Sequence, residues 1–139
     1  MLTISFLFSL YNFPSSVADQ LASRLLLADG FTEQYISTNQ HRLAESYEFA
    51  TDFLQSHSIP YKDCNAAFFI WMNLGAAMKD ATATDKEILA KLSGERVYIA
   101  PGTAYAGEEA GWFRMVFGHP PHILEEGLNR LVRAIQSKN

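Results

Sequence analysis

One arginine, Arg114, lies inside an otherwise uncharged stretch, GWFRMVF, at residues 111–117. A short aromatic and apolar stretch of this kind is typical of a half-buried β-strand. Side chains alternate between the two faces of a strand, so Trp112, Arg114 and Val116 share one face and the intervening apolar side chains share the other. A guanidinium that faces inward or into a cleft needs an anion, which belongs either to the protein or to a ligand.

Recognition of a carboxylate is the chemistry that an arginine offers at such a position. Its planar guanidinium can donate two parallel hydrogen bonds to the two carboxylate oxygens. A partner inside the protein would be Glu108 or Glu109, just before the stretch, and a third possibility is that Arg114 is an ordinary surface residue. Tyr105 and Thr103 follow a Pro-Gly pair and are candidates to line the same cleft, although each can equally pack elsewhere.

Other reactive side chains give weaker signals. His119 and His122 flank two prolines, but two histidines without a third ligand are weak evidence for a metal site, and a helix-entry turn explains the prolines better. The single cysteine, Cys64, excludes an internal disulfide. A reactive thiolate needs a positive neighbour, for which Lys62 is only a weak indication, so a buried or unreactive thiol is favoured. We therefore expect no metal site and no catalytic residue in this chain.

The elements that position these residues are delimited by proline, glycine and serine. Residues 1–13, MLTISFLFSLYNF, are apolar but have no Lys or Arg before the apolar run, which disfavours a secretory signal and favours a segment that packs against something. A helix is predicted over about 16–28, with Val17, Leu21 and Leu25 buried, and an Asp-Gly pair ends it.

A long helix is predicted over about 31–57, because apolar residues recur at three-, four- and seven-residue steps. The aromatic run at residues 66–74 predicts a buried strand. Further along, the pattern predicts a capping box at Thr84–Glu87 with a helix that Gly94 closes. The remaining predictions are a short strand over 96–100, a type II turn at Pro101-Gly102, the strand of Arg114, and an amphipathic helix after Pro120-Pro121.

This order of elements predicts an α+β fold. Its sheet is small, three-stranded and mostly antiparallel, and helices cover one of its faces. Residues 14–139 are predicted to form one domain after the atypical apolar segment 1–13.

The composition narrows the class of protein. The chain has 139 residues, enough for one domain, and 48% of them are hydrophobic, enough for a packed core. The formal net charge is −4 and Lys and Arg form no cluster, so we expect no nucleic-acid partner. No apolar run approaches the roughly 20 residues of a membrane-spanning helix, so we expect no membrane partner and a cytoplasmic protein.

Five segments resemble one enzyme family in the same order. The run FTEQYISTNQHRLAESYEF resembles the long interdomain helix of 1-aminocyclopropane-1-carboxylate synthase-like proteins, which are class I/II, fold-type I aminotransferases that use pyridoxal phosphate (PLP). AAFFIWMNL resembles the family's glycine-then-aromatic strand, although Ala67 stands where the family commonly has glycine. VYIAPGTAY, GWFRMVF and HPPHILEEGLNRL resemble the strand before the Pro-Gly active-site loop, the strand of the carboxylate-binding arginine, and the closing helix. The similarity covers about residues 14–136.

The resemblance implies the family's C-terminal small domain and its connecting helix, and it implies that Arg114 binds the substrate α-carboxylate. It also implies that the Schiff-base lysine, the aspartate that pairs with the pyridine nitrogen and the phosphate-binding residues lie upstream, in a large domain. No lysine of this chain has the Ser-x-x-Lys pattern expected of the Schiff-base lysine, so no PLP is expected in this chain.

Three functions stay open. The first is a truncated PLP-dependent aminotransferase or synthase-like protein that keeps the carboxylate-binding lobe and lacks independent PLP catalysis. The second is a non-catalytic interaction module, either a homo-oligomer or the partner of a full-length relative that bears the large domain. The third is a PLP-independent enzyme of specialised metabolism, which would need a closed pocket that holds Arg114 with Tyr105 or Thr103.

Overall fold

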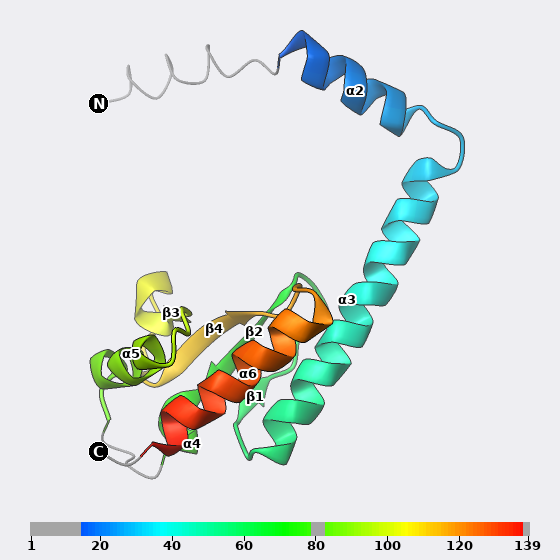
Figure 1. Ribbon diagram of the computed structural model, residues 1–139. Coiled ribbons are helices and arrows are strands. Elements are labelled where there is room, and N and C mark those ends of the chain that lie inside the picture. The colour runs from blue at the N-terminus through cyan, green and yellow to red at the C-terminus, as the bar shows by residue number, and fades with distance from the viewer. Residues whose placement is uncertain (1–14, 79–82, 138–139) are drawn as a thin grey trace, which may run out of the picture. The chain divides into compact units, whose positions relative to one another are not determined.

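The computed structural model describes residues 15–78 and 83–137, and the apolar segment 1–13 lies outside them. The chain divides into two compact units, residues 1–40 and 41–139, with the boundary inside one long helix. Figure 1 shows helices in the first unit and both helices and strands in the second. Among the described residues, no helix is long and apolar enough to cross a membrane.

The described part of the first unit is helical. Helix α2, Ser16–Leu26, begins after Ser15, whose hydroxyl oxygen accepts a hydrogen bond from the backbone N–H of Ala18 at 3.1 Å. The prediction that this helix buries its apolar stripe is wrong: Val17, Leu21 and Leu25 are 75%, 59% and 42% exposed. The predicted helix is confirmed, but the apolar stripe of a helix is buried only when another element covers it.

Helix α3, Phe31–Ser56, starts in the first unit and continues into the second, close to its predicted range. Its two halves differ in burial. Phe31 and Tyr35 near its start are exposed and stack on each other, whereas Ala50 and Leu54 are fully buried in the second unit. The predicted stripe therefore packs into a core only over the second half of the helix.

The second unit contains an antiparallel four-stranded sheet in the order β1-β2-β4-β3. Its strands are β1 Tyr61–Lys62, β2 Phe69–Asn73, β3 Ala100–Pro101 and β4 Trp112–Val116. The α+β prediction is confirmed, but the prediction of three strands is corrected to four, because a two-residue strand such as β1 has no readable alternation. The strand predicted over 96–100 is shortened and shifted to Ala100–Pro101.

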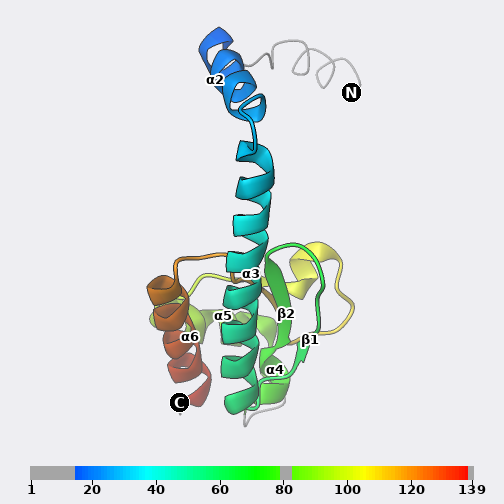
Figure 2. The same cartoon turned by 90° about the vertical axis from the view of Figure 1, so that its right-hand side faces the viewer.

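Helices cover one face of this sheet. The second half of α3 and helix α6, Pro121–Gln136, run side by side (Figure 2), and α5, Asp85–Gly94, packs against α6. The strand side chains that meet these helices are the alternate, buried ones: Ile70, Met72, Phe113 and Met115. The other face of the same strands carries half-buried side chains, and the functional candidates lie there.

One loop connects the helical layer to that open face. The predicted type II turn at Pro101-Gly102 is wrong, because Gly102 begins a 3-10 helix, η1 Gly102–Tyr105, and has no positive φ. Asp85 at the start of α5 secures the loop: its carboxylate accepts hydrogen bonds from the backbone N–H of Gly111 at 2.7 Å and from the Thr103 hydroxyl at 3.3 Å. The capping box that Thr84 and Glu87 form at this end of α5 is confirmed.

Gly111 and Ala67 are two of the six described residues that have left-handed φ angles. Gly111 has φ 85° and its Cα would lie 3.0 Å from a Cβ added at Gly75, so the two backbones approach too closely for side chains. Ala67, where glycine is common in the resembling family, has φ 68°. This residue therefore adopts a conformation that an L side chain disfavours. A short helix, α4 Leu74–Ala77, follows β2 and was not predicted.

Candidate functional site

The open face of the sheet brings β2 and β4 together around Arg114. In the antiparallel register Arg114 is paired with Trp71, and the next pair on the same face is Phe69 with Val116. All four side chains are half-buried. The alternation predicted for GWFRMVF is therefore confirmed: Arg114 is on the face opposite to Phe113, which is fully buried. The sequence pattern alone did not show which face the helices would cover.

Aromatic rings hold the guanidinium of Arg114. The guanidinium carbon lies 4.1 Å from the ring centroid of Tyr105 and 5.0 Å from that of Phe69. Contacts of this kind place the positive charge over the face of an aromatic ring and supply no oxygen acceptor to the guanidinium N–H groups. The two rings therefore hold the charged end of Arg114 in place without pairing it with a carboxylate.

Within the described residues, no carboxylate lies within ion-pair distance of Arg114. The alternative of an internal salt bridge to Glu108 or Glu109 is not realised there. Glu109 instead accepts a hydrogen bond from the indole N–H of Trp112 at 2.9 Å. Among the described residues, the guanidinium of Arg114 therefore has no ion-pair partner.

The other two candidate residues of the loop differ in position. Tyr105 lies against Arg114, and its ring meets Trp71 edge to face with the centroids 5.9 Å apart. Thr103 donates its hydroxyl hydrogen bond to Asp85, so this group serves the loop's attachment to α5. The structure thus brings Tyr105 and Arg114 together and engages Thr103 elsewhere.

Sequence reasoning missed several side chains of this face. A hollow of about 390 Å³ beside Tyr105 is lined by Lys62, Trp71 and Trp112 among others, and Arg114 is not part of its lining. The amine of Lys62 lies 5.1 Å from the ring centroid of Trp112. The alternation in FIWMN was a usable signal for Trp71, but Lys62 belongs to the two-residue strand β1, whose register only the fold reveals.

The described residues do not fit PLP by themselves. A phosphate group is commonly held by the backbone N–H groups at a helix N-terminus. The N-terminus next to the loop is that of α5, where Thr84 and Glu87 form a capping box and the Asp85 carboxylate already accepts the Gly111 N–H. The lysine of the open face, Lys62, lies over an indole ring and has no phosphate-binding residues placed around it.

The curated relatives that the chain resembles include 1-aminocyclopropane-1-carboxylate synthases and synthase-like proteins. The chain is 28% identical over 120 residues to 1-aminocyclopropane-1-carboxylate synthase-like protein 1 of Bos taurus, covering 86% of this chain and 24% of the relative. It is 31% identical over 129 residues to 1-aminocyclopropane-1-carboxylate synthase 7 of Arabidopsis thaliana, covering 88% of this chain and 28% of that protein. The chain thus spans about a quarter of the length of the curated relatives that it matches.

A solved structure shows the same fold. The crystal structure of an aromatic aminotransferase from Pyrococcus horikoshii OT3 superposes with a TM-score of 0.74 at 20% identity, covering 93% of this chain and 34% of that one. The family model of the class I and II aminotransferases matches residues 4–131, which is most of the chain. The α+β fold and the five segments of sequence similarity therefore have a common explanation: this chain belongs to the aminotransferase class I and II family.

Proposed function

We propose that this chain forms the lobe of a PLP-dependent enzyme site that binds the α-carboxylate of an amino acid or a similar substrate. The observation that carries the proposal is the state of Arg114. Its guanidinium is oriented by Tyr105 and Phe69, lies on the open face of the sheet, and meets no carboxylate among the described residues. A bidentate carboxylate would satisfy it.

The role of this chain in such a site is to bind and orient. PLP, when bound to a protein of this family, supplies the chemistry by stabilising a carbanion. Arg114 would bind the substrate carboxylate and thereby fix the orientation of the substrate. Tyr105 would keep the guanidinium in place through the contact with its ring. Because the phosphate-binding groups and a placed lysine are missing from the described face, the 139-residue chain by itself is not expected to carry out PLP catalysis.

A titration with L-alanine tests the carboxylate site. L-Alanine should cause saturable NMR shifts of Trp71 and Tyr105, whereas L-alaninamide, which lacks the carboxylate, should not. Arg114→Lys keeps a positive charge but loses the bidentate fork, so it should weaken the L-alanine response by at least about tenfold if both hydrogen bonds are used. Equal responses to the two ligands would contradict the proposal.

A second experiment tests the absence of independent catalysis. The purified chain is incubated with PLP and then passed through a gel-filtration column. We expect PLP to separate from the protein and the visible absorption band to leave with it. A visible band that stays with the protein, and that borohydride removes by reducing an imine between PLP and a lysine, would show a bound cofactor. That result would overturn this part of the proposal.

A second candidate function is association with a further copy of this chain. The observation that favours it is the apolar stripe of α2, where Val17 and Leu21 are both more than half exposed. Burial of such a stripe against a second helix is a common basis of dimers. Sedimentation over a series of concentrations tests this: a monomer at the highest concentration, or a dimer unaffected by Leu21→Glu, would contradict it.

A further inference from the structure

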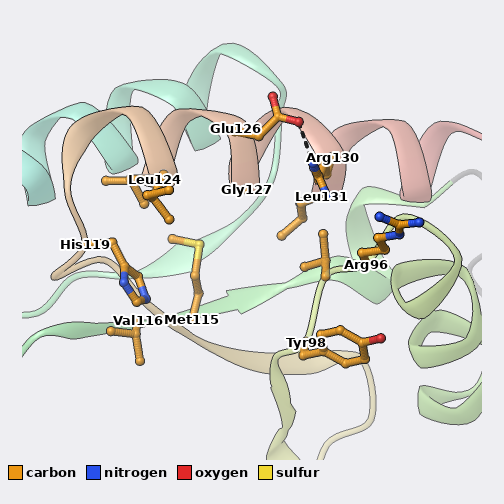
Figure 3. A pocket seen from close by; sticks show the side chains of 12 residues that line it. Arg96, Tyr98, Met115, Val116, His119, Leu124, Glu126, Gly127, Arg130 and Leu131 are labelled. Carbon is orange, nitrogen blue, oxygen red and sulfur yellow. Dashed lines mark hydrogen bonds and ion pairs between the residues drawn. The ribbon is translucent and has the colours of Figure 1, made fainter.

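A second cavity, of about 370 Å³, lies between α6 and the segment that precedes β3 (Figure 3). Its apolar lining includes Met115 of β4 with Leu124 and Leu131 of α6. Its charged lining comes from Arg96, Glu126 and Arg130. The cavity thus combines an apolar surface with a predominantly positive rim.

The cavity exists because β3 is short. β2 pairs with β4 along all five residues, but β3 pairs with β4 only at Arg114 and Phe113. On that side of the sheet the next residues of β4, Met115 and Val116, have no strand partner. Val97 and Tyr98, which a longer β3 would have placed in the ladder, line the cavity together with them.

Gly127 keeps the cavity open from the side of α6. A glycine inside a helix costs about 1 kcal/mol relative to alanine, so it needs a reason. Gly127 has no positive φ, and a Cβ added to it would meet no atom within 4 Å, so neither backbone conformation nor close packing requires glycine here. Its effect in this fold is to leave space next to Leu124 and Leu131.

Arg96 lies at the mouth in an unusual conformation. It follows the end of α5 with φ 59°, and the adjacent Val97 N–H donates to the Leu92 carbonyl at 2.8 Å, a helix-ending pattern in which glycine is favoured. An arginine therefore occupies a position that costs about 1 kcal/mol or more for a non-glycine residue. Among the described residues it has no ion-pair partner.

The remaining charges leave an excess of positive charge on the rim. The Nε of Arg130 donates to the Glu126 carboxylate at 2.7 Å, and Arg133 lies 3.9 Å from the same carboxylate. The hydrogen bond from Arg130 lowers the pKa of Glu126, so this carboxylate is ionised and balances Arg130 at neutral pH. Arg96 is then the unbalanced charge of the lining, and in Figure 3 it lies toward the same end of the cavity as Arg130.

We propose that this cavity binds a small amphipathic carboxylate, with its apolar chain on Met115, Leu124 and Leu131 and its carboxylate at Arg96 and the outer nitrogens of Arg130. The volume lies within the range of about 300–1,000 Å³ that is usual for small-molecule sites. The site is separate from the one at Arg114, because neither Arg114 nor the rings of Phe69 and Tyr105 that contact it line this cavity. It therefore does not depend on the proposed function.

The experiment compares three probes on the full chain by NMR titration. Octanoate carries both a carboxylate and an apolar chain, octylamine carries the same chain with a positive charge, and acetate carries the carboxylate alone. We expect octanoate to bind with a Kd of about 1 mM or lower and to shift signals of Gly127 and Leu131. Octylamine and acetate should bind at least about tenfold more weakly.

Two variants test the cavity without unfolding the protein. Gly127→Leu should fill the space, keep or raise the melting temperature because leucine is a better helix former, and weaken octanoate binding by at least about tenfold. Arg96→Gly removes the rim charge at a backbone position that suits glycine, so it should leave the fold stable and weaken binding about two- to fivefold, as for an exposed ion pair.

The control is Arg42→Ala, an exposed arginine of α3 that does not line this cavity, which should leave octanoate binding unchanged. Arg114→Ala then shows whether octanoate binds on the open face instead. Three results would each overturn the proposal: octylamine binding as tightly as octanoate, unchanged octanoate affinity in Gly127→Leu, or no saturable binding of octanoate at about 1 mM. A loss of octanoate binding in Arg114→Ala would place the ligand on the open face instead and would also count against it.

Discussion

The two faces of one sheet have opposite character in this protein. On the helix-covered face, Ile70, Met72 and Phe113 are fully buried and join a single apolar core. On the open face, the side chains one position away, such as Trp71 and Arg114, are half-buried and combine aromatic rings with a positive charge. Strand alternation thus separates the residues that form the core from those that the proposed ligand would contact.

The open face also depends on the covered one. Its loop is attached through Asp85, which belongs to a helix of the covered face and accepts the buried Gly111 N–H. The comparison therefore predicts a graded response to substitution: large losses of stability on the covered face, intermediate losses at the attachment and small losses on the open face.

The largest effect is expected for Phe113→Ala on the covered face. The ring is fully buried, so its removal should lower the free energy of unfolding by about 3–5 kcal/mol through lost transfer energy and a cavity. Urea denaturation followed by circular dichroism measures this. Phe113→Leu, which keeps most of the volume, is the control and should lose clearly less. A loss below about 1 kcal/mol in Phe113→Ala would contradict the expected difference in stability between the covered face and the open face.

Asp85→Ala should have an intermediate effect. It leaves the buried N–H of Gly111 without its acceptor, which costs about 1–3 kcal/mol. Hydrogen exchange of the Gly111 amide should speed up more than exchange in α6, because the loop loses its attachment while the helical layer keeps its packing. Asp85→Asn retains an acceptor oxygen and is the matched control. Unchanged exchange at Gly111 in Asp85→Ala would contradict the proposed attachment.

Arg114→Ala should change stability little. The cation–π contacts at a half-exposed site contribute about 0.5–1 kcal/mol, so the free energy of unfolding should fall by no more than that. The same denaturation assay serves, with Arg114→Lys as the control that keeps the charge. If Arg114→Ala destabilised the protein as much as Phe113→Ala, the open face would be part of the structural core rather than a binding surface.

The smallest effect is expected at an exposed ion pair on α6. The hydrogen bond from Arg130 lowers the pKa of Glu126 below its ordinary value of 4.5, so this pair stabilises the fold above that pH and the contribution is lost as the pH falls. Glu126→Gln should therefore be slightly less stable than the parent chain at pH 7 and equal to it in acid. Glu125→Gln is the control. A difference that grew in acid would contradict this sign.

The sequence pattern correctly predicted most single helices and strands and the strand face on which Arg114 lies. The helices around 16–28, 31–57 and 121–136 and the strands of Ile70 and Phe113 follow from hydrophobic period and capping residues. The burial of α2 was mispredicted, because an apolar stripe shows which face would pack but not whether a partner is present. The strand at 96–100 and the turn at Gly102 were displaced, because short elements take their limits from neighbouring backbones.

The chemistry of the candidate site divides in the same way. The sequence by itself determined that a guanidinium would alternate with apolar side chains on a strand, and its similarity to one family indicated a carboxylate ligand. Only the tertiary structure decided that the rings of Tyr105 and Phe69 contact the guanidinium of Arg114. It also decided that the Thr103 hydroxyl donates a hydrogen bond to Asp85 and that a cavity opens beside Gly127. The physical reason is the separation in sequence of the residues that interact. The period of a helix or strand is encoded by neighbouring residues. Register, loop attachment and cavities arise from contacts between segments far apart in the chain.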